Sequence, residues 1–182
     1  MRAGGRGALG PRRHLLLIGL SGAGKTTVGR LAAAALGAPF VDLDEEIVRH
    51  AGRPIAVLFQ EEGEAAFRAL ESACARDALA GAPAVVAAGG GFFDDPANRL
   101  AAHVGALTVY LEAESDTAAA RLEGSGGRPL LADGELAARL AAMLTRRRAG
   151  YLTAEHVVAT DGSTAEAVAR QVVSLAREHG GW

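Results

Sequence analysis

The fold of this chain is decided by residues 19–26, GLSGAGKT, which fit the phosphate-loop pattern G-x-x-x-x-G-K-[S/T]. Glycines let the backbone N–H groups of such a loop wrap around an anion, and the positive end of the following helix adds to the attraction. Lys25 can then reach the outer phosphates of a nucleotide, and the Thr26 hydroxyl can bind Mg²⁺. The loop therefore predicts a site for a nucleoside triphosphate together with Mg²⁺.

The segments on either side of the loop support this interpretation over a plain glycine-rich turn. The apolar run 14–18 before it is typical of a buried strand, and residues 25–36 after it have helical spacing that stops at Gly37. Lys25 is also the only lysine among 19 basic residues. A chain that otherwise uses arginine keeps a compact ammonium group at this position.

Strand and helix patterns alternate along the rest of the chain, which favours a parallel sheet with helices on both faces. Strands are expected over 14–18, 39–43, 84–88, 107–111 and 155–159, and helices over 25–36, 44–51, 55–61, 64–79, 115–122, 135–148 and 164–178. We therefore expect an α/β fold: a three-layer α/β/α domain with a five-stranded parallel sheet.

The overall composition excludes several classes of partner. A net charge of −2 gives no general attraction for nucleic acid or an anionic membrane, and no apolar run approaches the length of a membrane span. Residues 1–13 are rich in Gly and Arg and lack the apolar core of a signal peptide, so we expect a disordered extension and a cytoplasmic protein. The single cysteine, Cys74, excludes an internal disulfide and is expected in the core.

Polar and glycine-rich segments follow two of the expected strands. Asp42 and Asp44 lie where the second strand ends, so both carboxylates can face the crevice that binds ligands in open α/β sheets, although helix capping would give the same pattern. Residues 89–91 are three glycines after the third strand, which suits a close approach of the backbone to a ligand, or a plain loop.

Arginines occur at three places that suit anion binding. Arg68 and Glu71 are three residues apart and can pair on one helix face, at a site or simply at the surface. Arg128 follows a glycine-rich segment, which predicts a mobile lid whose arginine stabilises charge on a transferring phosphoryl group. Residues 146–148 are three arginines near a helix end, where they can also complement the helix dipole.

The order and spacing of these motifs resemble the shikimate kinase family, within the nucleoside monophosphate kinase-like P-loop fold, over about residues 15–174. The resemblance implies one P-loop kinase domain over 14–182, with a lid at about 123–134. It also implies transfer of the ATP γ-phosphoryl group to the 3-hydroxyl of shikimate, in the pathway to chorismate and the aromatic amino acids. We expect a monomer with shikimate as its small-molecule partner.

The resemblance also implies roles for individual residues. The expected ATP-binding residues are Gly22, Ala23, Gly24, Lys25, Thr26, Thr27, Arg121 and Arg128, and the expected metal ligands are Thr26 and, through water, Asp42. The expected shikimate-binding residues are Asp44, Arg68, Gly89, Gly90, Gly91 and Arg147, with Phe59 and Phe67 beside the acceptor and Glu71 orienting Arg68. Catalysis is expected from Lys25, from Asp44 as the general base, and from Arg128.

Three alternatives stay open at this point. A gluconate kinase-like protein would also bind a carboxylate and hydroxyls, so charge alone does not exclude it. A non-catalytic nucleotide-binding module is disfavoured because Lys25, Asp44 and Arg128 are all present. Arg148 can take the place of Arg147, because the alignment of that helix end depends on Tyr151 alone.

Overall fold

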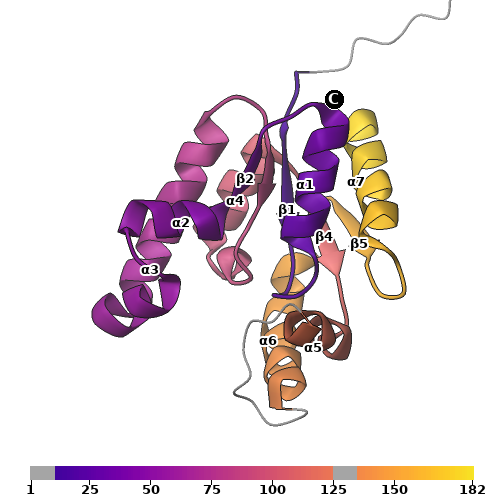
Figure 1. Ribbon diagram of the computed structural model, residues 1–182. Helices are drawn as coiled ribbons and strands as arrows, with labels where there is room; N and C mark the ends of the chain where they lie inside the picture. The colour runs from indigo at the N-terminus through magenta and orange to yellow at the C-terminus, as the bar shows by residue number, and fades with distance from the viewer. Residues whose placement is uncertain (1–10, 125–134) are drawn as a thin grey trace, which may run out of the picture.

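The computed structural model describes residues 11–124 and 135–182. Its strands form one parallel sheet of five in the order β2-β3-β1-β4-β5 (Figure 1). Their bounds are β1 (His14–Ile18), β2 (Phe40–Asp42), β3 (Val85–Ala87), β4 (Ala106–Glu112) and β5 (His156–Ala159). The predicted five-stranded parallel sheet is confirmed.

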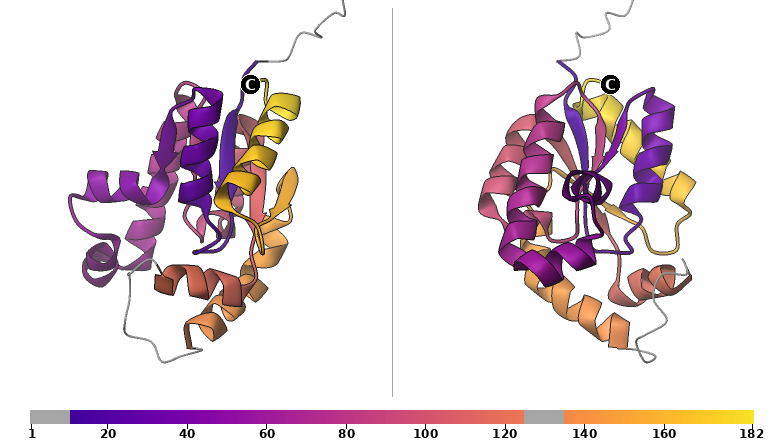
Figure 2. Two further views of the ribbon diagram at one scale, coloured as in Figure 1. Left: turned by 45° about the vertical axis from the view of Figure 1, so that its right-hand side comes forward. Right: turned by 60° about the vertical axis from the view of Figure 1, so that its left-hand side comes forward.

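Helices cover both faces of this sheet, which makes the predicted three layers (Figure 2). The helices are α1 (Lys25–Leu36), α2 (Leu43–Ala51), α3 (Ile55–Ala80), α4 (Pro96–Gly105), α5 (Ser115–Gly124), α6 (Glu135–Tyr151) and α7 (Ala165–His179), with a short 3₁₀ helix η1 (Phe92–Asp94). Helices α1 and α7 lie side by side on one face and α3 and α4 lie on the other, while α6 packs against α5 and η1 at the carboxyl end of the sheet.

The buried strand β1 explains why both faces need cover. Leu15 and Leu17 pack into the core under α1 and α7, whereas Leu16 and Ile18 pack into the core of the opposite face. Successive side chains of a strand point to opposite faces, so a strand between two helix layers is apolar throughout. This packing fixes β1 at the centre of the sheet and places Gly19 at its carboxyl edge.

The middle of the chain departs most from the sequence-based expectation. Helix α3 spans both helices predicted there, and Gly63, with φ 80° and ψ 177°, is the break between them. No element was predicted over η1 and α4, although the start of α4 carries a recognisable signal. Asp95 accepts a hydrogen bond from the Ala97 N–H at 2.8 Å, and Pro96 occupies the first turn.

A small third core joins α2 to α3. It contains Ile47, Leu58, Phe67 and Cys74, so the predicted burial of Cys74 is confirmed. This core holds α2 against α3 to one side of the sheet.

Two predicted segments fall largely outside the described residues: the extension over 1–13 and the lid over about 123–134 with Arg128. Arg13, which was counted with the extension, belongs to the fold because its backbone N–H donates to the Gly180 carbonyl and its side chain pairs with Glu155 at 2.7 Å. Among residues 11–124 and 135–182, no helix has the length and apolar character that crossing a membrane requires.

We predict that Gly19→Ala destabilises the protein more than Gly37→Ala. Both glycines have positive φ, 142° and 62°, which costs an alanine about 1–2 kcal/mol. A Cβ at Gly37 would meet nothing within 4 Å, whereas one at Gly19 would lie 2.5 Å from the Leu111 carbonyl oxygen of β4. Urea denaturation should show an additional loss of at least about 2 kcal/mol for Gly19→Ala. Equal losses for the two variants would contradict the close approach of this loop to β4.

Candidate active site

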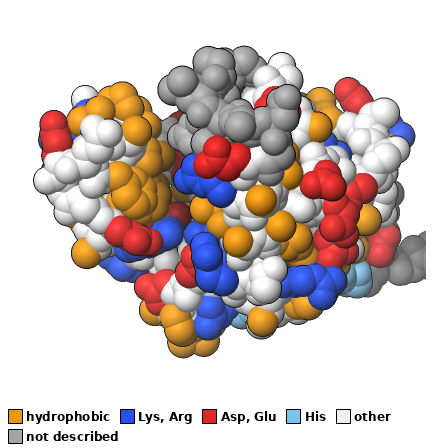
Figure 3. All heavy atoms as spheres, turned by 90° about the horizontal axis from the view of Figure 1, so that it is seen from below, with side chains coloured by type: hydrophobic (Ala, Val, Ile, Leu, Met, Phe, Trp, Pro, Cys, Tyr) orange, Lys and Arg blue, Asp and Glu red, His pale blue; other side chains and the backbone are white. Residues whose placement is uncertain are grey.

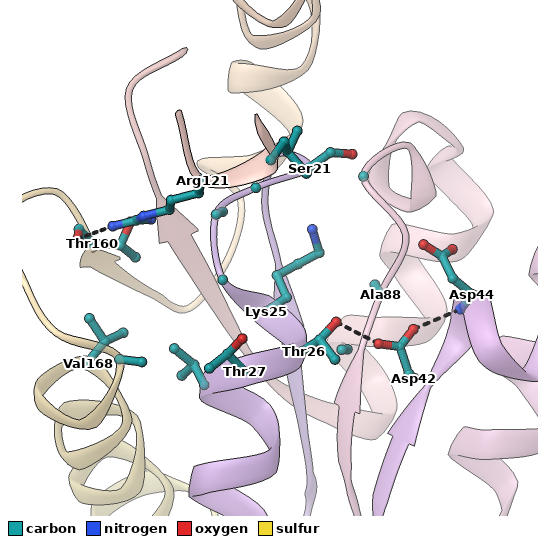
Figure 4. A pocket seen from close by; sticks show the side chains of 18 of the residues that line it. Ser21, Lys25, Thr26, Thr27, Asp42, Asp44, Ala88, Arg121, Thr160 and Val168 are labelled. Carbon is teal, nitrogen blue, oxygen red and sulfur yellow. Dashed lines mark hydrogen bonds between the residues drawn. The ribbon is translucent and has the colours of Figure 1, made fainter. Parts of the chain in front are cut away.

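The loop between β1 and α1 forms one wall of a pocket of about 580 Å³ at the carboxyl edge of the sheet (Figure 4). The loop and the first turn of α1 contribute all the predicted phosphate-binding residues, Gly22, Ala23, Gly24, Lys25, Thr26 and Thr27. The opposite walls come from Asp42 at the end of β2, from Asp44 of α2, from Arg121 of α5 and from Thr160 beyond β5. The structure thus brings these predicted residues together in one cavity.

Lys25 extends back across its own loop. Its Nζ donates to the carbonyl oxygens of Gly19 and Leu20, each at 2.9 Å. Burial lowers the pKa of this ammonium to about 8, although Asp44 and Asp42 act in the opposite direction. A buried ammonium group whose charge is only partly balanced by nearby carboxylates is suited to bind an anion that enters the pocket.

Asp42 connects α1 to the start of α2. Its Oδ2 accepts a hydrogen bond from the Thr26 hydroxyl at 2.7 Å, and its Oδ1 accepts one from the Asp44 N–H at 3.0 Å. The capping alternative is therefore correct for Asp42, which is the N-cap of α2. A hydroxyl and a carboxylate at this distance are also the hard oxygen ligands that suit Mg²⁺ with water completing its shell.

Asp44 does not cap the helix and instead directs its carboxylate toward the pocket (Figure 4). Burial raises the pKa of this carboxyl, Asp42 raises it further, and Lys25 opposes both. A carboxylate whose pKa is raised in this way is a better proton acceptor than an exposed aspartate.

A second pocket, of about 420 Å³, lies between α2, α3, α6 and the loop that follows β3. Its lining includes Asp44, Phe59, Phe67, Arg68, Glu71, Gly89, Gly90, Gly91 and Arg147, which are the predicted acceptor residues. Arg68 Nη1 donates to Glu71 Oε2 at 2.8 Å, and Glu71 is almost fully buried. Burial raises the pKa of Glu71 and the bond from Arg68 opposes it, so this pair holds the guanidinium in place.

The three glycines after β3 are needed because polar side chains occupy the space beside them. A Cβ at Gly89 would lie 2.6 Å from Glu71 Oε1, and one at Gly91 would lie 2.5 Å from Arg68 Nη1. A Cβ at Gly90 would lie 3.2 Å from Ser21 Oγ of the phosphate loop. The three glycines thus lie in close contact with the phosphate loop and with side chains of α3.

The structure separates the adjacent arginines of α6. Arg147 lines the acceptor pocket, is 13% exposed, and its Nε donates to Asp94 Oδ2 at 3.0 Å. Arg148 is 55% exposed and pairs with Glu112 at 3.2 Å, away from both pockets. Of these two arginines, therefore, Arg147 lines the acceptor pocket and Arg148 does not, and Arg146 also lines that pocket.

The face that carries both pockets is hollowed and strongly charged (Figure 3). Seen from the end where the strands finish, basic and acidic side chains border a hollow between α2 and α3 on the left and α6 in the centre. A local charged site therefore exists in a chain whose net charge is only −2.

Comparison with known proteins agrees with this geometry. Residues 21–177 match the model of the family described as shikimate kinase. A shikimate kinase from Salinibacter ruber is 46% identical over 168 residues, which cover 87% of this chain and 82% of that protein.

The chain belongs to the shikimate kinase family.

Solved structures of shikimate kinases have the same fold as this chain. A shikimate kinase from Acinetobacter baumannii, solved in complex with shikimate, superimposes with a TM-score of 0.84 at 32% identity, over 92% of this chain and 94% of that one. A gluconokinase from Sinorhizobium meliloti gives a TM-score of 0.62 at 18% identity, over 93% of this chain and 95% of that one. The gluconokinase likeness shows a shared fold alone.

Some residues in or beside the two pockets of this shikimate kinase family member were not singled out by sequence. Thr160 fixes Arg121, whose Nη1 donates to the Thr160 hydroxyl at 2.9 Å and whose Nη2 donates to its carbonyl at 2.7 Å. Asp94 holds Arg147, and Ser21 lines both pockets. Only Ser21 carried a sequence signal, its place inside the phosphate loop.

We predict that ATP affinity falls as the pH rises through about 8. The Lys25 pKa of about 8 means that the free protein loses this charge above that pH. Triphosphate binding favours the charged form of Lys25. Above about pH 8 the protein must therefore take up a proton when it binds ATP, and its affinity for ATP should fall by up to about tenfold per pH unit. Calorimetric titration with a non-hydrolysable ATP analogue between pH 7.5 and 9.5, in buffers of different ionisation enthalpy, measures both effects.

Lys25→Arg is the matched control for this experiment. The guanidinium of this variant stays charged from pH 7.5 to 9.5. Its affinity for the ATP analogue, whether higher or lower than that of the wild type, should therefore not fall as the pH rises. Wild-type affinity that stays constant from pH 7.5 to 9.5 would show that Lys25 is already charged in the free protein.

Proposed function

We propose that this protein transfers the γ-phosphoryl group of ATP to the 3-hydroxyl of shikimate, as part of the pathway to chorismate and the aromatic amino acids. One observation carries the proposal: the nucleotide pocket and the acceptor pocket share Ser21, Asp44 and Gly90. A phosphate at the end of one pocket is therefore next to a hydroxyl bound in the other. Family membership supplies the ATP-dependent phosphotransfer chemistry.

The nucleotide side neutralises and orients phosphate charge. The backbone of residues 22–27 surrounds the phosphates, and Lys25 exchanges its carbonyl partners for the outer phosphates. Mg²⁺ would be held by the Thr26 hydroxyl and, through water, by Asp42, and it supplies further neutralisation of the phosphate charge. Phosphoryl transfer depends mainly on this positioning and neutralisation.

The acceptor side recognises a carboxylate together with hydroxyls. Arg68 and Arg147 enter the pocket from different helices, and each is oriented by a carboxylate, Glu71 for Arg68 and Asp94 for Arg147. Planar guanidinium groups held in this way suit the shikimate carboxylate. Asp44 then accepts a hydrogen bond from the reacting hydroxyl and takes its proton, a role that its raised pKa favours.

The remaining sequence-based predictions stay predictions. Arg128 and the lid lie outside the described residues. A monomer, a cytoplasmic location and the absence of nucleic acid and membrane partners rest on composition and family. A gluconate acceptor would meet the same charges, but the solved protein that binds shikimate is far more similar to this chain than the gluconokinase is.

The proposal predicts rapid ATP turnover that depends on added shikimate. A coupled assay over shikimate, gluconate and other small hydroxy acids should give a kcat/KM for shikimate at least about 100-fold higher than for the others. A higher kcat/KM for gluconate would make this a kinase of another acceptor. No turnover with any of the acids would favour the non-catalytic nucleotide-binding module.

Arg147→Ala and Arg148→Ala form a matched pair that tests the acceptor site. Loss of a charge-assisted partner costs about 1.5–3 kcal/mol, so Arg147→Ala should raise the KM for shikimate roughly 10–100-fold and leave the KM for ATP almost unchanged. Arg148→Ala removes an exposed ion pair with Glu112 and should behave like the wild type. Steady-state kinetics with each substrate varied would detect the opposite pattern, which would assign the carboxylate to Arg148.

A further inference from the structure

Tyr151, the last residue of α6, reaches the glycine loop from behind. Its side chain is buried, and its hydroxyl donates a hydrogen bond to the carbonyl oxygen of Gly90. Gly90 lines both pockets, whereas Tyr151 lines neither. The contact therefore joins α6 to the wall of the site without adding a side chain to it.

Each glycine of the loop has its carbonyl held by one donor. The Gly89 carbonyl accepts from the Phe92 N–H at 3.1 Å and the Gly91 carbonyl accepts from the Asp94 N–H at 3.0 Å, both within the local turn. The Gly90 carbonyl accepts from Tyr151, which is distant in sequence. Glycine backbone has unusual freedom, so the middle peptide of this loop depends on that distant donor for its orientation.

The orientation of this peptide decides where its N–H points. The Gly90 carbonyl and the Gly91 N–H belong to one trans peptide unit, in which the two groups point in opposite directions. Because the carbonyl is held toward Tyr151, the Gly91 N–H is directed away from it. Within residues 11–124 and 135–182, this N–H donates to no other group, and Gly91 lines the acceptor pocket.

A neighbouring tyrosine isolates the contribution of the hydroxyl. Tyr110 of β4 is fully buried and stacks on Tyr151, with ring centroids 5.0 Å apart and an interplanar angle of 27°. In the described part of the chain the Tyr110 hydroxyl has no hydrogen-bond partner. The two rings therefore share the packing role, and only Tyr151 also contacts the loop.

The Tyr151 hydroxyl stays a donor over the working pH range. Burial raises the pKa of this phenol well above its ordinary value, and the nearby Arg147 guanidinium opposes the shift only in part. Arg147 lies one helical turn before Tyr151. Its guanidinium is close to the same glycine, because a Cβ at Gly90 would lie 3.6 Å from Arg147 Nη1. One helix end thus supplies both an acceptor arginine and the support for the loop beside it.

We propose that Tyr151 is a positioning residue for the acceptor: its hydrogen bond to the Gly90 carbonyl turns the Gly91 N–H toward the acceptor pocket as a donor. This inference rests on the proposed function, because the acceptor meant is a polyhydroxylated carboxylate phosphorylated at the same site. It assigns no proton transfer to Tyr151 and no contact with the substrate.

The test compares Tyr151→Phe with Tyr110→Phe, since each variant removes one buried hydroxyl from the same stack. For Tyr151→Phe we expect the KM for shikimate to rise about 3- to 10-fold, with kcat and the KM for ATP unchanged within about twofold. Tyr110→Phe should match the wild type in all three constants. Melting temperatures of both variants show whether either change merely loosens the fold.

Several outcomes would overturn the inference. Tyr151→Phe could match the wild type, it could change all three constants together with a lower melting temperature, or Tyr110→Phe could give the same rise in KM. Each outcome would remove the specific link between the Tyr151 hydroxyl and acceptor binding.

A substrate-free measurement separates this inference from the proposed function. Amide hydrogen exchange of Phe92 and Asp94, whose N–H groups donate to the Gly89 and Gly91 carbonyls, can be followed by NMR. It should be at least about threefold faster in Tyr151→Phe than in the wild type, and unchanged in Tyr110→Phe. If the wild type failed to turn over shikimate, the proposed function would fall, and the exchange data would still decide whether Tyr151 orders the loop. Equal exchange in all three proteins would refute the ordering role.

Discussion

The site depends on the close approach of two loops that leave neighbouring strands of the sheet. Strands β1 and β3 are paired in parallel, so the phosphate loop and the glycine loop emerge at the same edge. They come so close that a Cβ at Gly90 would lie 3.2 Å from Ser21 Oγ. A side chain at residue 90 would fill the place where the two pockets meet. The sheet register and the absence of a side chain at Gly90 together let these two loops come this close.

Charges around this junction are buried, and each is only partly compensated. Burial lowers the pKa of Lys25 and raises those of Asp44 and Glu71, and in each case a neighbour of opposite charge resists the shift. Incomplete compensation costs stability in the free protein, but it leaves the groups free to interact with phosphates, a carboxylate and hydroxyls. The site is in this sense organised before its substrates arrive.

Local patterns in the sequence predicted most of the fold. The features that the sequence did not predict depend on contacts between residues that are distant in the chain. The phosphate loop with Lys25 and the apolar strand runs are local signals, and the structure confirms the strand, loop and helix that they predict. Which of Arg147 and Arg148 lines the acceptor pocket depends on how α6 is rotated relative to Asp94. Asp94 belongs to η1, an element that the sequence did not predict. The role of Tyr151 likewise depends on a hydrogen bond to Gly90, 61 residues away, which no local pattern indicates.

The central claim is that the two pockets meet at Ser21, Asp44 and Gly90, so that the phosphoryl group passes directly from nucleotide to acceptor. The most direct measurement uses ATP made chiral at its γ-phosphorus with oxygen isotopes and determines the configuration of the phosphorylated product. A single in-line transfer inverts the configuration, and we predict inversion. Retention would require two successive transfers through a phosphorylated protein side chain, and it would contradict direct transfer across the shared wall.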